Sequence, residues 1–430
     1  MKKLALVLTG LLMAIAFAPA ASALPAFSRQ TGMACTACHQ QHFPVLNSFG
    51  RAFKASGYSM AGAQIKVEDE HLSIPGTLNA AILLKIRYQK DNTPGTYDAT
   101  GLTSAGDGQW QFGDEVSVFF GGRIAENVGF LIEGNAANHS VNGAGTGGFL
   151  AGIRLPMMFA AGPAKVGVIP FSTDALGVAY GFELSSAGVM RANRWAEHRR
   201  ETSAYQYNAE RGDNGAANGF AFVAQNDMGF INYSMWSPNP LMGGNGGGVN
   251  STKMDSHYLR IAATPTLGDW DMVIGAQFIG GTSWTNINSQ SSAAPAPVRI
   301  ITRQSGADLQ AHGKVGGNDI GIYATYASAP SDAVLANAYN GTIGGANRRA
   351  FVLGADYSVI PNRLHLGAAY RSAKNGKLAN DGDNAVTLTA VYDLLQNAAF
   401  HADYSTYSGS ARDAAGAQKN LLTLMLEGSW

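Results

Sequence analysis

Residues 363–372 read RLHLGAAYRS and residues 384–393 read NAVTLTAVYD, and in both stretches apolar side chains alternate with small or polar ones. In the first stretch, Leu366 and Tyr370 share one face, whereas Arg371 belongs to the other. Such alternation is typical of a β-strand, because successive side chains point to opposite faces. Segments of about ten residues with this pattern, separated by turns, predict a transmembrane β-barrel with an apolar face toward lipid and a polar face toward the lumen.

The connections between these segments alternate in length. Long loops rich in Gly, Asn and Ser are predicted near residues 237–253, 281–298, 329–348, 373–383 and 408–419, with short turns near residues 265–269, 313–318, 359–362 and 394–397. Long loops outside the cell and short turns in the periplasm are typical of outer-membrane barrels. The alternation therefore predicts an even number of strands, with both chain termini in the periplasm.

The length of the barrel region indicates how many strands it holds. The chain ends in an alternating stretch, residues 421–430, whose last residue is the aromatic Trp430, as is common in outer-membrane barrels. At roughly 22 residues for each strand with its share of loop, residues 77–430 predict an all-β, antiparallel barrel of about 16 strands. Residues 156–217 do not follow the alternation, and we assign no strands there.

The composition excludes several other classes of protein. Only 14% of residues are charged, with 30 Lys and Arg against 30 Asp and Glu, so the chain lacks the basic excess that nucleic-acid binding requires. Its 2 cysteines exclude a disulfide-stapled scaffold. A hydrophobic content of 46% with a mean hydropathy of −0.04 is too polar for a helical membrane bundle, but it suits strands with one apolar face.

The first residues have the pattern of a secretory signal peptide. Lys2 and Lys3 precede an apolar run over residues 4–17, and Ala-Ser-Ala at residues 21–23 supplies small residues before a cleavage site. The apolar run is shorter than the ~20 residues that a membrane-spanning helix needs. We therefore expect residues 1–23 to be removed and the mature protein to leave the cytoplasm.

Both cysteines fall within one short motif, CTACH at residues 35–39. This is the attachment signature of a c-type haem, in which two thiols add to two vinyl groups of the porphyrin and the adjacent histidine reaches the iron. A thioredoxin-like redox pair is the alternative, but the βαβ pattern that surrounds such a pair is missing. The motif predicts one covalently bound haem c, attached through Cys35 and Cys38, with His39 as the proximal iron ligand.

The second axial ligand of the haem iron is less well specified. His42 follows His39 too closely to reach the opposite face of the ring and fits a propionate contact or a surface position better, while Met33 is tethered next to Cys35. Met60 and His71 are far enough along the chain to cross over the ring, and we predict that one of them is the distal ligand. Methionine would raise the haem potential relative to a second histidine.

The segment between the signal peptide and the barrel, residues 24–76, is too short to fold independently without a staple. A covalent haem would supply an apolar core, and a barrel of about 16 strands leaves an aqueous lumen that needs filling. We therefore predict three parts: the signal peptide, a small helical haem-binding segment at 24–76 that plugs the lumen, and the transmembrane barrel at 77–430.

The densest charge cluster lies within the part of the chain where no strands are assigned. It consists of Arg191, Arg194, Glu197, His198, Arg199, Arg200 and Glu201. One interpretation is a lumen loop that steers ions or contacts the haem propionates. We prefer a solvated loop or lumen wall, because a polar interior is normal for such a barrel.

The N-terminal segment resembles the fused outer-membrane monohaem cytochrome–porins of iron-oxidising bacteria. The resemblance rests on residues 23–32 (ALPAFSRQTG), the CTACH motif, residues 43–58 (FPVLNSFGRAFKASGY) and residues 71–75 (HLSIP), and it continues beyond them in architecture and length. It implies that extracellular Fe(II) gives an electron to the haem held by Cys35, Cys38 and His39. It further implies a soluble periplasmic cytochrome or other carrier as acceptor, and a lipid-embedded barrel in the outer membrane.

Two alternatives to this function remain open at the level of the sequence. The conduit could take electrons from another extracellular donor or a partner protein, since members of the family also occur in organisms not known to oxidise iron. The chain could instead be a diffusion porin whose haem segment is a structural plug. One-electron transfer needs no general acid or nucleophile, so no catalytic residue is predicted.

Overall fold

The computed structural model describes residues 25–430 apart from residues 63, 71, 96, 99–100, 103–104, 137–149, 210–214, 239–252 and 286–297. The predicted signal peptide, residues 1–23, and the candidate distal ligand His71 lie outside the described residues. Among the described residues, no helix is both long and apolar enough to cross a bilayer.

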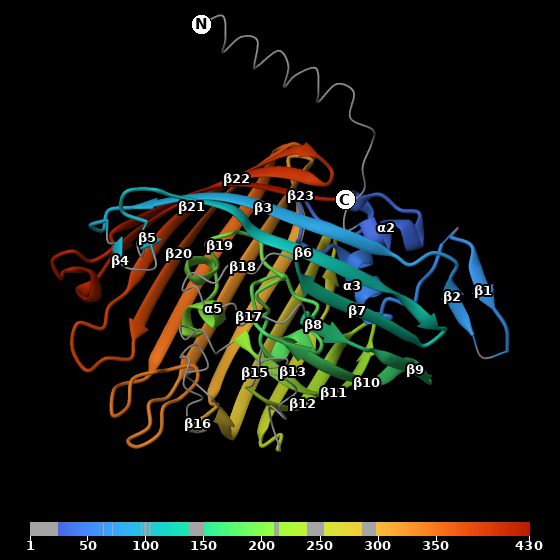
Figure 1. The fold of residues 1–430 in the computed structure, drawn as a ribbon, viewed down its shortest axis with the longest axis horizontal. Helices are drawn as coiled ribbons and strands as arrows, with labels where there is room; N and C mark the ends of the chain where they lie inside the picture. Colours follow the sequence, from blue (N-terminus) through green and yellow to red (C-terminus); the bar gives the residue numbers. More distant parts are fainter. Residues whose placement is uncertain are drawn as a thin grey trace, which may run out of the picture.

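An antiparallel sheet closes on itself to form a barrel (Figure 1). Closure is made by β23 (Asn420–Ser429), the last strand of the chain, which pairs with β3 (Ala80–Asp91). The other pieces of the barrel are β6 (Gln109–Ala125), β7 (Val128–Asn135), β8 (Leu150–Arg154), β9 (Met157–Ala161), β10 (Ala164–Thr173), β11 (Ala217–Asn226), β12 (Gly229–Ser237), β13 (Ser256–Ala263), β14 (Thr266–Leu267), β15 (Trp270–Thr285), β16 (Val298–Ile301), β17 (Gln304–Val315), β18 (Asn318–Ala329), β19 (Arg348–Ile360), β20 (Leu364–Asn375), β21 (Asn384–Leu395) and β22 (Ala398–Ser408).

The number of strands agrees with the prediction. Three strands are interrupted, because β8 with β9, β13 with β14 and β16 with β17 each form two pieces of one strand. The nineteen pieces within the described residues therefore make a closed barrel of sixteen antiparallel strands. This confirms the predicted all-β barrel.

The side chains alternate as the sequence pattern predicts. In β20, Leu366 and Tyr370 are 44% and 48% exposed on the outside of the barrel, whereas His365 and Arg371 are each 1% exposed on the inside. Short turns join β17 to β18, β19 to β20 and β21 to β22, and longer connections join the opposite ends of the strands. One end of the barrel, called the short-turn end below, therefore carries the short turns, and the other is called the long-loop end.

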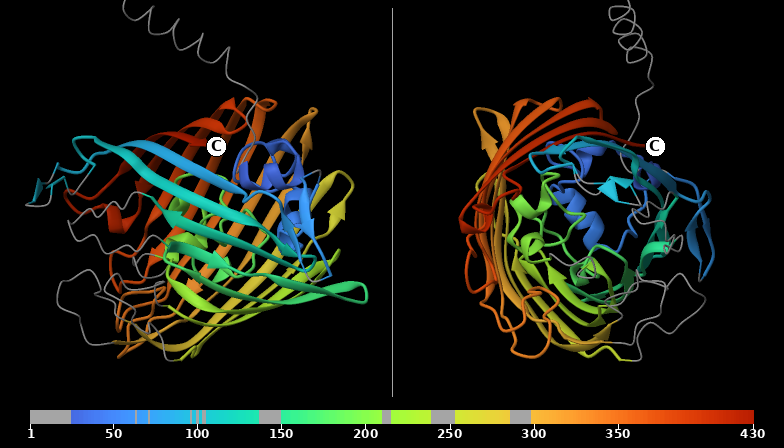
Figure 2. Two further views of the ribbon diagram at one scale, coloured as in Figure 1. Left: turned by 45° about the vertical axis from the view of Figure 1, so that its right-hand side comes forward. Right: turned by 60° about the vertical axis from the view of Figure 1, so that its left-hand side comes forward.

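The N-terminal segment forms helices that lie inside the barrel at its short-turn end (Figure 2). They are α2 (Pro25–Thr31), the 3₁₀ turn η1 (Cys35–Ala37) and α3 (Ser48–Ala55). Asn47 caps α3 by accepting a hydrogen bond from the Gly50 N–H at 2.9 Å. Arg51 of α3 pairs through one guanidinium nitrogen with both carboxylate oxygens of Asp271 in β15, which ties the helix to the barrel wall.

The region without alternation contains a second segment inside the lumen, residues 174–209, called the inner segment below. It includes the 3₁₀ turn η2 (Val178–Tyr180), α4 (Arg199–Thr202) and α5 (Ala204–Asn208). Its aromatic side chains, including Trp195 and Tyr207, are buried in the main apolar cluster of the protein. Because this segment builds a core inside the barrel instead of crossing the wall, its apolar residues follow no strand period. Within the same region, β9 and β10 are strands that the sequence pattern did not predict.

Three small elements complete the chain. The strands β1 (Lys66–Glu68) and β2 (Ser73–Pro75) form a hairpin outside the barrel beside the mouth that holds α2 and α3 (Figure 1). The strands β4 (Tyr97–Asp98) and β5 (Gly101–Leu102) form a second hairpin between β3 and β6, and η4 (Ser410–Arg412) follows β22.

Candidate haem-binding cavity

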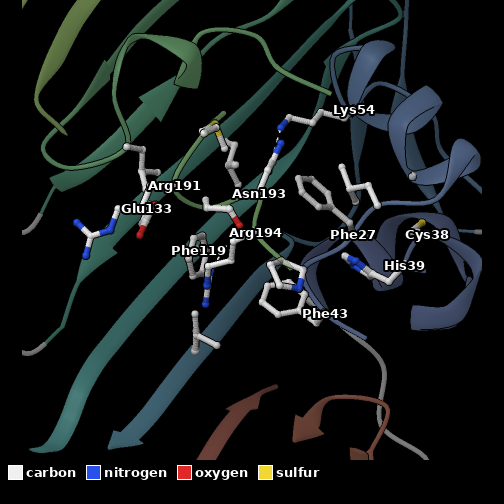
Figure 3. A pocket seen from close by; sticks show the side chains of 18 of the residues that line it. Phe27, Cys38, His39, Phe43, Lys54, Phe119, Glu133, Arg191, Asn193 and Arg194 are labelled. Atoms are coloured by element: carbon white, nitrogen blue, oxygen red, sulfur yellow. Dashed lines mark hydrogen bonds between the residues drawn. The ribbon is translucent and has the colours of Figure 1, made fainter. Parts of the chain in front are cut away.

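A cavity of about 370 Å³ lies between the N-terminal helices, the strands β3, β6 and β7, and the inner segment. This volume is within the range of ~300–1,000 Å³ that is common for ligand and cofactor sites. Cys35, Cys38 and His39 all line the cavity, so the three predicted haem-attachment residues share one space. Figure 3 shows Cys38 and His39 on one side, with Arg191 and Glu133 across from them.

The backbone of the CTACH motif turns tightly and presents the His39 ring to the cavity. The His39 N–H donates to the Cys35 carbonyl oxygen at 2.9 Å. On the ring, Nδ1 lies 3.2 Å from the Val45 carbonyl oxygen, which leaves Nε2 as the nitrogen available for a metal. Burial lowers the pKa of His39 to about 4 in spite of that hydrogen bond, so the ring is neutral, as an iron ligand must be.

The two cysteine side chains are thiols that form no disulfide with each other. Burial raises the pKa of the Cys38 thiol above its ordinary value, so it remains protonated at neutral pH. Cys35 is 6% exposed, and its N–H donates to the Gln396 side chain, in the turn between β21 and β22, at 3.2 Å. That hydrogen bond holds the motif against the short-turn end of the barrel.

Gly50 lets α3 pack directly on the motif. Replacing it by alanine should therefore destabilise the protein, although alanine has the higher helix propensity. Alanine in a helix is favoured over glycine by about 1 kcal/mol. A Cβ at position 50 would, however, overlap the Cys38 carbonyl oxygen. We expect Gly50→Ala to lower both the melting temperature and the yield of covalent haem, at a cost of about 1–3 kcal/mol for overpacking.

The matched control for this prediction is Ala52→Gly, at an exposed position of the same helix. It removes about 1 kcal/mol of helix propensity without approaching the motif. Haem yield should therefore be normal in Ala52→Gly and reduced in Gly50→Ala. A higher melting temperature in Gly50→Ala with full haem content would contradict the packing argument.

Apolar side chains line the cavity near the motif, and charged side chains of both signs line the rest of it. Near the motif it is lined by Phe27, Phe43, Leu46 and Phe53 and, from β6, Phe119. A flat apolar macrocycle would lie favourably against such a surface.

Two cations that line the cavity, Lys54 of α3 and Arg154 of β8, form no ion pair with any described residue. Lys54 is 8% exposed, and its Nζ has only Asn193 Oδ1 as a hydrogen-bond partner, at 3.4 Å. Arg154 is 6% exposed and donates to the Tyr180 carbonyl oxygen at 2.9 Å, while its Nε has no partner. Burial and the nearby Arg154 hold the pKa of Lys54 well below its usual range. Buried cations without an ion-pair partner are costly, so these two side chains are suited to contact an anionic ligand.

Much of the charge cluster of the inner segment is buried and ion-paired in the lumen, whereas Arg191 and Arg200 are exposed. Arg194 and His198 are 6% and 4% exposed, so the interpretation as a solvated loop is wrong for them. Glu197 contacts Arg194, Arg87 of β3 at 3.3 Å and Arg199 at 3.4 Å. Although burial opposes ionisation, Arg194 and Arg199 hold the pKa of Glu197 well below its usual range. The ion pair between Glu197 and Arg87 links the inner segment to the barrel wall.

The structure places the other candidate iron ligands away from the CTACH motif or leaves them undescribed. Met60 is 36% exposed, does not line the cavity, and its carbonyl oxygen accepts from Gln30 Nε2 at 2.7 Å. His71 lies outside the described residues. Met33 and Met190 supply the other sulfur atoms in the cavity lining. The sequence could not place Met190 in this lining, because Met190 is far from the CTACH motif in the chain and lies where no strand pattern predicts its position.

His42 points toward the barrel wall, where neither of its expected roles is met. Its Nε2 lies 3.5 Å from Asp356 Oδ2, and its ring packs near those of His365 and His401, with centroids 5.5 and 6.3 Å away. The side chain is 5% exposed, so it is not a surface group. Within the part of the chain that the structure describes, no three His, Cys, Asp or Glu side chains are grouped closely enough to hold a metal ion by themselves.

Comparisons with known proteins find similarity in the barrel. No family model and no curated protein sequence matches the chain. Among solved structures, it is similar to the outer membrane channel DcaP of Acinetobacter baumannii, with 10% identity, a TM-score of 0.48 and coverage of 86% of this chain and 100% of that one. It is also similar to OmpF of Salmonella typhi, with 11% identity, a TM-score of 0.48 and coverage of 85% of this chain and 100% of that one. For OmpT of Vibrio cholerae, the identity is 10%, the TM-score is 0.46, and the coverage is 85% of this chain and 100% of that one. Each of these similarities concerns the fold alone.

Proposed function

We propose that this protein is an outer-membrane c-type cytochrome of the fused cytochrome–porin kind. In this proposal it takes electrons from extracellular Fe(II) and passes them through a haem inside the barrel to a soluble periplasmic carrier. The observation that carries the proposal is the cavity itself, where Cys35, Cys38 and His39 line the same space as two buried cations that form no ion pair, Lys54 and Arg154.

The outer surface of the barrel supports a location in the outer membrane. Large apolar side chains on many strands are exposed on the outside, among them Phe159, Val166, Phe222, Ile231, Ile261, Ile274, Phe278, Phe351, Leu353, Leu388 and Leu426. A lipid-facing band of this kind is typical of transmembrane barrels. The barrel's first strand begins, and its last strand ends, at the short-turn end, which is the periplasmic end in such barrels.

The chain would hold the haem with residues from three parts of the structure. Cys35 and Cys38 would form the thioether bonds, and His39 would ligate the iron through Nε2, with its ring oriented by the Val45 carbonyl oxygen. Lys54 and Arg154 would balance the two propionates. When bound, the haem supplies reversible one-electron exchange at its iron. The protein's own part is to bury the ring, neutralise its propionates and keep it inside a barrel that spans the membrane.

The alternative of a diffusion porin has less support. The N-terminal helices and the inner segment both occupy the lumen, and the inner segment contributes 13 of the 37 described buried residues of the main apolar cluster. A porin that passes solutes needs a water-filled channel instead of such a core.

The deciding experiment is optical. The purified protein in detergent is oxidised and then mixed with Fe(II) near neutral pH without oxygen, while the haem absorption bands are followed. Prompt reduction is the expected result. A haem that dithionite reduces and Fe(II) does not would reject iron as the donor, and a preparation without haem bands would reject the cytochrome altogether.

A further inference from the structure

A second cavity, of about 440 Å³, lies between the inner segment and the barrel wall, on the side of the long loops. Gln418 and Tyr339, which line it, come from the long connections before β23 and β19. The haem motif, in contrast, is hydrogen-bonded to the short turn at Gln396. The second cavity is therefore placed between the long-loop end of the barrel and the candidate haem cavity.

The two cavities meet at residues that line both of them. These are Ala175, Leu176 and three arginines, Arg87 of β3 with Arg191 and Arg199 of the inner segment. All the charged residues at this junction are thus cationic. The acidic residues of the second cavity, Glu197 and Glu201, line that cavity alone.

The three arginines differ in how far their charge is compensated. Arg87 pairs with Asp114 at 2.8 Å and with Glu197 at 3.3 Å. Glu197 also forms an ion pair with Arg199. Arg191 is exposed to the cavities and forms neither a hydrogen bond nor an ion pair with any described residue, although its charge acts on Asp174. Arg191 is therefore the group at the junction that remains available to a passing ligand.

We propose, resting on the function proposed above, that the arginine junction favours an anionic donor, a ferrous chelate with carboxylate ligands, over the aqueous Fe(II) cation, which reduces the haem more slowly. Positive charge between low-dielectric walls concentrates anions and repels cations. Carboxylate oxygens are ligands that suit hard cations, and guanidinium groups recognise carboxylates through paired hydrogen bonds. The chelated Fe(II) would give up one electron and become Fe(III), and a haem held by Cys35, Cys38 and His39 would accept that electron, with no proton or ligand exchanged.

The test compares two one-electron donors of opposite charge on the purified holoprotein. Ferrous EDTA is a dianion and hexaammineruthenium(II) is a dication, and each reduces the haem in a stopped-flow experiment. At low ionic strength we expect Arg191→Gln to slow reduction by ferrous EDTA about three- to tenfold and not to slow reduction by the cation. At about 1 M salt the difference should disappear. Arg349→Gln, an exposed arginine that lines neither cavity, is the matched control.

Each result has a defined meaning. Equal effects of Arg191→Gln on both donors, no effect on either, or the same effect from Arg349→Gln would overturn the selection of anions. Faster reduction by uncomplexed Fe(II) than by its EDTA or citrate complex would overturn the chelate as substrate. Failure of the function proposed above is recognised separately, because a protein without haem bands, or one that no ferrous donor reduces, fails before any variant is compared.

Discussion

Replacing Cys35 and Cys38 together by alanine is expected to abolish covalent haem and all Fe(II)-driven absorbance change, while the barrel still folds. Thioether attachment requires the two sulfur atoms, so the double variant cannot carry haem c. The barrel is held by sixteen paired strands, and neither cysteine lies in one of them. The measurement is the mass of the denatured chain with and without haem, together with the Soret band of the folded protein.

Two controls separate loss of haem from loss of fold. The heat-dependent mobility of a folded barrel on a gel reports whether the strands close. The single variant Cys35→Ala keeps one thioether position and should retain haem in part. If the double variant reduced an acceptor as fast as the natural chain, the electron would have to travel by another route and the diffusion-porin alternative would regain support.

The barrel was predictable from the sequence because its signal is local. Each strand carries its own alternation, as in β20, where Leu366 and His365 face opposite ways, and each hairpin carries its own turn residues. Gly316 and Gly317, both with positive φ, make the two-residue turn between β17 and β18. Loop lengths then indicated which end of the barrel is which, and the length of the region indicated the strand count, without knowledge of any long-range contact.

The position of the inner segment was not predictable, because its side chains contact residues that are distant in the sequence. Trp195 stacks on Tyr323 of β18 at 5.0 Å, and the Tyr205 hydroxyl donates to Asp308 of β17 at 3.2 Å. Nothing in the spacing of residues 174–209 reports these strands. Its charged residues therefore resembled a solvated loop, although the fold places them inside the lumen.

The candidate site divides in the same way. The CTACH motif contains its own chemistry, so Cys35, Cys38 and His39 could be named from five residues of sequence. The two buried cations could not be named in this way, because Lys54 of α3 and Arg154 of β8 come to line one cavity only in the folded barrel. Sequence spacing favoured Met60 and His71 equally as distal ligand; the structure places Met60 outside the cavity, and His71 lies outside the described residues.

The inner segment is anchored by a buried ion triad, and removing its cation should destabilise the protein strongly. Arg260 of β13 pairs with Glu183 of the inner segment at 2.9 Å and with Asp308 of β17, and all three side chains are 0% exposed. Arg260→Met would leave two carboxylates buried side by side without a counter-charge. Breaking a buried pair in this way costs about 3–5 kcal/mol. We expect a clearly lower melting temperature in detergent and faster proteolysis within the inner segment.

Loss of charge compensation and loss of packing are two explanations for instability of Arg260→Met. They predict different stabilities for a variant in which all three charges are removed. The triple variant Arg260→Met, Glu183→Leu, Asp308→Leu removes all three charges and should recover most of the lost stability, since apolar replacement of a buried ion network is often neutral. Lys314→Met removes only an exposed ion pair, that of Lys314 with Asp319 at 3.9 Å, and should cost less than about 1 kcal/mol. If the triple variant were as unstable as Arg260→Met alone, lost packing would explain the effect. Because the inner segment also carries Arg191 and part of the cavity lining, the single variant should lower the yield of covalent haem together with stability, and the triple variant should regain both.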